Sequence, residues 1–217
     1  MSIIKVKNLS AYYESRRVFE NLNFDVQDGD YLCIIGENGT GKTTLMKLLL
    51  GLDVKHTGNV KFEGFTKKEI GWLPQKTQHQ ADFPASVKEI VMSGFAGRNF
   101  LGLFYGKNQK QQATKNMDIL GIADIAEMSF TELSGGQQQK VLLCRALCAA
   151  KRVLLLDEPA SSLDSAAADE LYALIKKLNQ NGLAIIMITH DIARAEREAK
   201  NILTLSHGGY EYEKGVK

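Results

Sequence analysis

The chain has 217 residues, of which 44% are hydrophobic and 24% are charged. A chain of this length and composition buries a substantial hydrophobic core, which excludes an intrinsically disordered protein and a small disulfide-stapled scaffold. The formal net charge is only +2, with 27 Lys and Arg residues against 25 Asp and Glu residues. The composition therefore does not indicate the broad basic face that many nucleic-acid-binding proteins carry.

The sequence contains no strong membrane signal. No apolar run approaches the roughly 18 residues that a membrane-spanning helix needs, and the amino terminus lacks the pattern of a signal peptide. We therefore expect a soluble, cytoplasmic protein that reaches any membrane through a partner. The three cysteines, Cys33, Cys144 and Cys148, lie in apolar surroundings and are too few for a disulfide framework.

The first part of the sequence predicts short strands around a glycine-rich turn. Alternation of apolar and polar residues at 4–7 and 22–26 predicts antiparallel strands near the amino terminus. A helix is expected over residues 43–50. Short apolar runs predict further strands at 31–35, 60–62 and 70–73.

From about residue 86 the pattern changes to helices, which are expected at 86–92, 110–120 and 136–150. Apolar strands at 153–156 and 184–188 then flank an amphipathic helix at 166–179, and a last hairpin is expected at 202–215. Apolar strands that alternate with helices predict a mainly parallel sheet covered on both faces. We predict one α/β domain over 1–217, with a helical insertion at about 77–150.

A phosphate-binding pattern follows the strand at 31–35. The sequence Gly36-Glu-Asn-Gly-Thr-Gly-Lys-Thr43 fits G-x-x-x-x-G-K-[ST] between a strand and a helix. Its glycines let the backbone wrap a phosphate with inward-pointing N–H groups, Lys42 faces the β- and γ-phosphates, and the Thr43 hydroxyl can ligate Mg²⁺. The pattern predicts a nucleoside triphosphate site formed by Gly36, Glu37, Asn38, Gly39, Thr40, Gly41, Lys42, Thr43 and Thr44.

Two carboxylates end the apolar strand at 153–156. In a parallel sheet this end of a strand lies at the ligand-binding edge. We expect Asp157 to hold Mg²⁺, directly or through water, and Glu158 to polarise the attacking water. Alone, such a pair would be a solvated strand end. Together with the glycine loop it predicts hydrolysis of the nucleotide.

The sequence Leu133-Ser-Gly-Gly-Gln137 opens a predicted helix before these carboxylates. With this motif the chain resembles, over essentially its whole length, the nucleotide-binding subunit of an ATP-binding cassette (ABC) transporter. Other elements of that family occur in order, namely Tyr13, Gln75, Asp164 and His190. The resemblance implies a P-loop NTPase with a mostly parallel RecA-like sheet, an N-terminal antiparallel β subdomain and an inserted helical subdomain.

The resemblance also implies a head-to-tail homodimer that holds ATP between the glycine loop of one copy and the Leu-Ser-Gly-Gly-Gln motif of the other. In that arrangement phosphate lies at a helix N-terminus formed by Ser134, Gly135, Gly136 and Gln137. Asp164 is implied to organise the opposite subunit's site. The glycine loop has Glu37 where many relatives have proline, and Thr43 where many have serine. Neither difference removes a needed donor.

Three further roles rest on the same resemblance. Tyr13 is implied to stack on adenine, although a strand tyrosine can also pack in a core, and Tyr12 is a weaker rival. Gln75 is implied to reach the metal and the attacking water. His190 is implied to bond the γ-phosphate and to help position the water and Glu158.

The expected partners are integral membrane permease subunits, an extracytoplasmic substrate-binding protein that acts indirectly, and no nucleic acid. This places the chain on the cytoplasmic face of the cell membrane. The segment 82–98, with Phe83-Pro-x-x-Val87 and Gly94-x-x-x-Arg98, resembles the zinc, manganese and iron importer subfamily. Divalent metal import is therefore expected, with iron-chelate import as the alternative, although this subunit does not touch its cargo.

Two other functional classes are less compatible with the sequence. ABC ATPases that act on DNA or ribosomes favour tandem cassettes, coiled-coil insertions or basic arms, and a small-molecule kinase would not need the Leu-Ser-Gly-Gly-Gln motif. The i, i+4 spacing of Cys144 and Cys148 is compatible with metal ligation, but their apolar neighbours indicate that both pack as small hydrophobic residues. Three histidines, His56, His79 and His207, are scattered through predicted loops and form no convincing ligand set. An aromatic stretch is either core or a groove for a permease helix, and it comprises Phe95, Phe100, Leu103, Phe104 and Tyr105.

Overall fold

The computed structural model describes residues 1–13, 16–75, 84–96, 105–207 and 209–216, and the described strands form two sheets. The smaller sheet has three antiparallel strands in the order β2-β1-β4, with bounds Arg16–Gln27, Ser2–Tyr13 and His56–Phe62. The larger sheet has six strands in the order β5-β6-β7-β3-β8-β9. Their bounds are Ile70–Leu73, Val153–Asp157, Ala184–Ile188, Tyr31–Gly36, Asn201–Ser206 and Gly209–Lys214.

The larger sheet is parallel from β5 to β8, and the β8–β9 pair at its end is antiparallel. Every residue of β6 and β7 is buried. This burial on both faces explains why these strands are continuous apolar runs in the sequence. The predicted α/β fold, with a mostly parallel sheet and antiparallel strands at the amino terminus, is confirmed.

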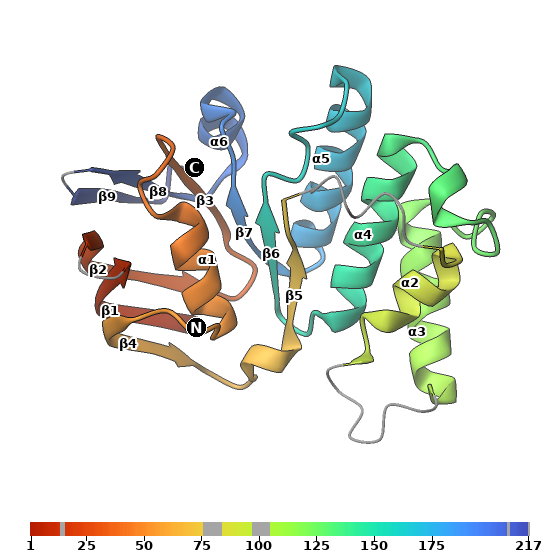
Figure 1. Cartoon of the computed structure of the whole chain (residues 1–217), viewed down its shortest axis with the longest axis horizontal. Helices are drawn as coiled ribbons and strands as arrows, with labels where there is room; N and C mark the ends of the chain where they lie inside the picture. Colours follow the sequence, from red (N-terminus) through yellow and green to blue (C-terminus); the bar gives the residue numbers. More distant parts are fainter. Residues whose placement is uncertain (14–15, 76–83, 97–104, 208, 217) are drawn as a thin grey trace.

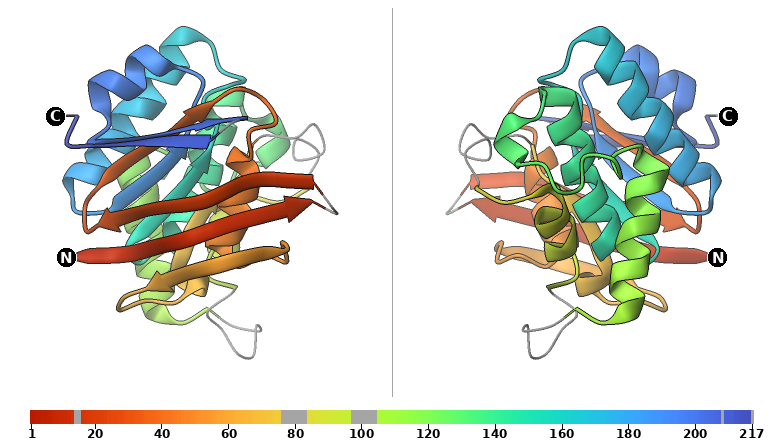
Figure 2. Two further views of the ribbon diagram at one scale, coloured as in Figure 1. Left: turned by 90° about the vertical axis from the view of Figure 1, so that its left-hand side faces the viewer. Right: turned by 90° about the vertical axis from the view of Figure 1, so that its right-hand side faces the viewer.

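Helices cover both faces of the larger sheet (Figure 1). One helix, α1, lies between the two sheets, whereas α4 and α5 lie on the other face and α2 and α3 pack beyond them. Figure 2 shows the three-stranded sheet on one side of the molecule and α2 to α4 on the opposite side. The bounds of α1 to α6 are Lys42–Leu50, Val87–Ser93, Lys107–Leu120, Gly135–Ala149, Ser165–Gln180 and Ile192–Glu198.

The core has two layers because successive residues of β3 point to opposite faces of the sheet. Leu32 and Ile34 pack with α1 and the smaller sheet. Tyr31, Cys33 and Ile35 pack toward α4 and α5. The strand that carries the glycine loop is therefore held rigidly from both sides.

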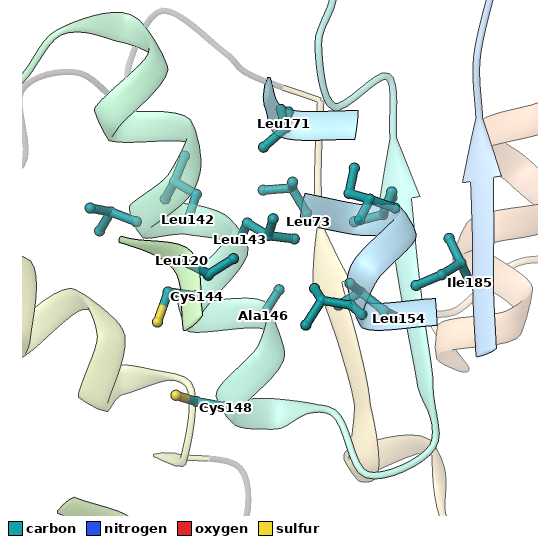
Figure 3. Packing of buried hydrophobic residues seen from close by; sticks show 14 of the residues in the cluster. Leu73, Leu120, Leu142, Leu143, Cys144, Ala146, Cys148, Leu154, Leu171 and Ile185 are labelled. Atoms are coloured by element: carbon teal, nitrogen blue, oxygen red, sulfur yellow. The ribbon is translucent and has the colours of Figure 1, made fainter. Parts of the chain in front are cut away.

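The core layer on the helical side includes all three cysteines, and Figure 3 labels two of them, Cys144 and Cys148. Cys144 and Cys148 are both buried among apolar side chains of α4 and its neighbours. The amide nitrogen of Asn116, on α3, lies 3.3 Å from the Cys148 sulfur. The prediction that these cysteines pack as small hydrophobic residues is confirmed.

The aromatic stretch is only partly described. Phe95 is buried in the same core layer and Tyr105 packs against it, which confirms the core interpretation for these two residues. The other residues of interest in this part of the chain lie outside the described residues, namely His79, Asp82, Phe83, Arg98, Phe100, Leu103 and Phe104. Among the described helices, none has the length and apolar character needed to cross a bilayer.

Candidate nucleotide site

The candidate site lies where three neighbouring parallel strands end. The order β6-β7-β3 brings the ends of these strands to one edge of the sheet (Figure 1). Gly36 ends β3, Asp157 ends β6, and Thr189 and His190 directly follow β7. This edge is where open α/β sheets bind their ligands. The topology thus gathers segments that lie more than a hundred residues apart.

The backbone of the glycine loop is fixed by its neighbours. Gly36 and Gly41 have φ values of 141° and 99°, in the region that side-chain-bearing residues rarely adopt. A Cβ atom at Gly36 would lie 2.1 Å from the carbonyl oxygen of Leu205, and one at Gly41 would lie 2.5 Å from the side chain of Val18. The loop packs closely between β8 and β2, so these neighbours restrict its backbone conformation.

Lys42 is held across this loop. Its ammonium group donates hydrogen bonds to the carbonyl oxygens of Gly36 and Glu37, at 2.7 and 2.8 Å. Only 6% of the residue is exposed, and this burial lowers the pKa of Lys42, although Glu158 and Asp157 oppose the shift. A buried cation held by two neutral carbonyl groups is suited to moving onto a phosphate oxygen.

The rest of the loop presents polar groups outward. Thr40 is buried, and its hydroxyl donates to the carbonyl oxygen of Glu37, which closes the loop on itself. Thr43 and Thr44 lie in the first turn of α1, where backbone N–H groups lack partners within the helix. The side chain of Thr43 is exposed, so its hydroxyl is accessible to a metal ion.

Glu158 has an unusual backbone conformation and a well-defined carboxylate. Its φ of 48° is in the left-handed region, and its N–H donates to the carbonyl oxygen of Ile188 in β7. The Gln75 amide nitrogen lies 2.8 Å from one carboxylate oxygen, and His190 Nε2 lies 2.8 Å from the other. A strained non-glycine residue held in this way is typical of a functional site. The fold brings Gln75, Glu158 and His190 into direct contact.

Asp157 is the last residue of β6 and directly precedes Glu158. It is only 5% exposed, and burial raises its pKa, with the neighbouring charge of Glu158 as the second cause. A nearby cation would stabilise the charged form of this carboxylate. The side chains of Asp157, Thr43 and Gln75 offer oxygen ligands of the kind that Mg²⁺ prefers.

The glycine loop opens into a cavity of about 860 Å³. Tyr13 lines it and is 69% exposed, so the alternative that this residue packs in the core is wrong. The other lining residues include three that belong to no sequence motif, Arg17, Val18 and His207. The remaining lining residues are Asn38, Gly39, Gly41, Lys42, Thr43, Thr44, Gln75 and Glu158. An aromatic wall, a cationic phosphate loop and oxygen ligands together fit ATP with Mg²⁺.

The start of α4 lines a second cavity, of about 380 Å³. Ser134, Gly135, Gly136 and Gln137 lie there with Asp164. The described residues that line this cavity do not include any that line the first. The two phosphate-binding parts predicted from the sequence therefore occupy separate surfaces of the chain.

Three side chains that line the second cavity have local partners. The Ser134 hydroxyl accepts a hydrogen bond from the Gln137 backbone N–H, and the Gln137 side chain accepts one from the Ser134 N–H. This is a reciprocal capping box. Asp164 caps α5 by accepting from the Ala167 N–H at 2.9 Å. The ends of α4 and α5 are thus formed without a ligand.

Comparisons with known proteins give a consistent family. A family model for ABC transporters matches residues 19–161. The manganese transport system ATP-binding protein MntB of Halalkalibacterium halodurans is 33% identical over 208 residues, which cover 94% of this chain and 83% of that protein. The zinc uptake system ATP-binding protein ZurA of Listeria innocua is 31% identical over 212 residues, which cover 94% of this chain and 82% of that protein.

Solved structures agree with these sequence relatives. An inward-facing structure of a metal-chelate type ABC transporter is 32% identical to this chain and superposes with a TM-score of 0.89. The superposition covers 99% of this chain and 84% of that chain. The similarity thus extends over both sheets and the helical layer.

Proposed function

The chain belongs to the ABC transporter family and acts as an ATPase, and from this premise we propose that it energises an importer of divalent metal ions. The observation that carries the hydrolytic part is the position of Glu158 at the edge of the nucleotide cavity. Its two carboxylate oxygens are held by Gln75 and His190. A carboxylate fixed at this point is suited to accept a proton from water.

In the proposed mechanism ATP binds with its adenine against Tyr13 and its phosphates in the glycine loop. Backbone N–H groups of the loop and the first turn of α1 surround the phosphates, and Lys42 exchanges its carbonyl partners for phosphate oxygens. Thr43, Asp157 and Gln75 would hold Mg²⁺, which supplies positive charge to the phosphates when it is bound.

Glu158 then acts as the general base for the attacking water, while His190 and Gln75 orient the Glu158 carboxylate. A positioned base contributes about 10²–10⁴-fold to a rate, and the contribution depends on hydrogen-bond geometry as much as on pKa. Because both oxygens of Glu158 are already contacted, its orientation is set in the free chain.

We further propose that two copies of the chain form a head-to-tail dimer around ATP. The separation of the two cavities supports this arrangement, since one chain does not bring its own Ser134 next to its own Lys42 cavity. In the dimer, the partner's α4 N-terminus would face the γ-phosphate. Permease subunits would bind this dimer at the cytoplasmic face of the membrane.

Replacement of Glu158 by glutamine tests the hydrolytic proposal. The change keeps shape and hydrogen bonding but removes the proton acceptor, so we expect ATP hydrolysis to slow at least about a hundredfold. ATP should still bind, and the variant should accumulate as an ATP-bound dimer in size-exclusion chromatography. Glu127→Gln, an exposed change on the helical side, is the matched control and should hydrolyse ATP normally. Wild-type turnover by Glu158→Gln would refute the mechanism.

The proposal of a metal cargo is supported by the names of the manganese and zinc relatives. It is tested in cells that lack this chain, by measuring accumulation of radioactive manganese and zinc. Complementation with the intact chain should restore uptake of at least one of the two ions, and Glu158→Gln should not. Restored uptake of an iron chelate alone would favour the alternative cargo.

A further inference from the structure

The position of His190 depends on a short turn. His190 lies between the end of β7 and the start of α6, and its side chain is half exposed. Helix α6 has only seven residues, too few for stability in isolation. Something outside the turn must therefore hold the imidazole at its 2.8 Å contact with Glu158.

Asp191 is the first element of that support. One of its carboxylate oxygens accepts from the Arg194 backbone N–H at 2.9 Å, which caps α6. Its own N–H donates to the Thr189 hydroxyl at 3.1 Å. Asp191 thus joins the residue before His190 to the helix after it.

Arg194 connects this turn to the rest of the fold. Its guanidinium donates to the second Asp191 oxygen at 3.2 Å and to Asp169 on α5. It also lies 3.6 Å from Glu198 and stacks 4.2 Å from the centre of the Tyr172 ring. Only 15% of the Arg194 side chain is exposed, although Asp169 is mainly exposed. One planar cation therefore fixes the turn to α5, which packs on β7.

These contacts surround a cavity of about 310 Å³ behind the catalytic carboxylate. Its lining includes Glu158 and His190 together with Tyr172, Asp191 and Arg194. Because the space lets His190 turn away from Glu158, a loss of the Arg194 contacts would widen the range of imidazole orientations.

We propose that Arg194 is a positioning residue for ATP hydrolysis, which sets His190, and through it Glu158, by holding Asp191 against α5. The inference rests on the proposed function of Glu158 and His190. Arg194 does not contact the nucleotide cavity among its described lining residues. Its effect should therefore fall on turnover and leave ATP binding unchanged.

The experiment compares Arg194→Gln with Arg197→Gln in ATPase assays of the purified chain. Arg197 is on the same helix, is mainly exposed and also lies near Glu198. Since small displacements of a catalytic group can be costly, we expect Arg194→Gln to lower kcat about tenfold, with KM for ATP changed less than about twofold. Arg197→Gln should change neither. Arg194→Lys, which keeps the charge but loses the planar fork, should restore kcat only in part.

A double mutant separates positioning from general stability. If Arg194 acts through His190, then Arg194→Gln should cause no further loss in a His190→Ala background, measured by single-turnover hydrolysis with enzyme in excess. An additional tenfold loss in that background, or a normal kcat for Arg194→Gln alone, would overturn the inference. If Arg194→Gln does not fold, Asp169→Asn decides. That exposed change should lower kcat about threefold without affecting KM, and a wild-type kcat would overturn the proposal.

Glu158→Gln in the same assay distinguishes this inference from the function on which it rests. If Glu158→Gln keeps full turnover, the proposed function fails and the role of Arg194 fails with it. If Glu158→Gln loses turnover while Arg194→Gln keeps it, only the role of Arg194 is refuted.

Discussion

The glycine loop and the start of α4 are the two segments proposed to offer backbone N–H groups to phosphate, and the chain secures them differently. The loop is held by close packing, because a side chain at Gly36 or Gly41 would collide with β8 or β2. The start of α4 is held by its own capping box between Ser134 and Gln137. The backbone of the packed loop is ready to bind, and only Lys42 has to leave its two carbonyl partners. The capped helix end must instead exchange the hydrogen bonds of its own capping box for those of a ligand. The comparison suggests that ATP first binds the loop and that α4 engages it second.

The largest effect should come from removing the cation of the loop. Lys42→Ala should raise the Kd for ATP at least about a hundredfold, because charge-assisted hydrogen bonds to phosphate are lost. Hydrolysis should fall with binding. Isothermal titration of ATP measures the change, and Lys47→Ala, an exposed change on the same helix, is the control. Near-normal binding and turnover by Lys42→Ala would show that the loop does not hold the triphosphate.

Ser134→Arg tests the start of α4 as the second phosphate-binding segment. The larger side chain should fill the space before α4 and abolish the ATP-bound dimer that Glu158→Gln forms, while the ATP affinity of the single chain changes less than about twofold. Size-exclusion chromatography of the double variant tests the first expectation and isothermal titration tests the second. Ser134→Ala, which removes only the cap, should lower stability by about 1 kcal/mol. A dimer that persists with Ser134→Arg would place the second phosphate contact elsewhere.

Replacement of His207 should have a smaller effect, on the affinity of the glycine-loop cavity for ATP. It lines the nucleotide cavity, and its Nε2 lies 4.0 Å from the Glu37 carboxylate. Loss of one exposed polar contact should raise the Kd for ATP by about two- to fivefold in His207→Ala. His56→Ala is the control, since His56 lines a different cavity. Equal affinities for the two variants would show that His207 only borders the site.

The reactivity of the cysteines tests how firmly the strand before the glycine loop and helix α4 are packed. Cys33 lies in β3 beneath the glycine loop, where burial raises its pKa to about 12, and Cys144 lies on α4, where a hydrogen bond with Cys148 and burial raise its pKa. None should react with a thiol reagent within minutes in the folded chain, and all three should react in urea. Slower labelling of Cys33 than of Cys144 in native conditions would support the firmer packing of the loop. The reverse order would contradict it.

Much of the site is predictable from sequence because its parts are short and contiguous. The glycine loop, Asp157 and Glu158 each combine a local pattern with a strand end, and the parallel sheet brings these ends together. The contact of Gln75 and His190 with the Glu158 carboxylate follows from tertiary structure, although their order along the chain predicts that they share a site. Arg17, Val18 and His207 carry no local pattern, and only the approach of β2 and the β8–β9 turn to the loop reveals them.

The secondary structure likewise includes elements that the sequence predicts well and elements that depend on tertiary contacts. Apolar runs predict β6 and β7 well, because these strands are buried on both faces. The sequence pattern does not predict helix α6, because the segment is short and largely polar and its stability comes from Asp191 and Arg194. Strand β4 begins at His56, earlier than the expected 60–62, because pairing with β1 extends it through polar residues and Gly58.

The left-handed backbone of Glu158 has a consequence for the engineering of this chain. A glutamate in that conformation costs free energy of folding that asparagine would reduce, because asparagine tolerates positive φ better. Selection for heat resistance alone would therefore favour replacement of Glu158, and the resulting chains would fold well and turn over poorly. Stability and turnover oppose each other at this position, so a screen for robust variants must also select for ATP consumption if it is to retain the glutamate.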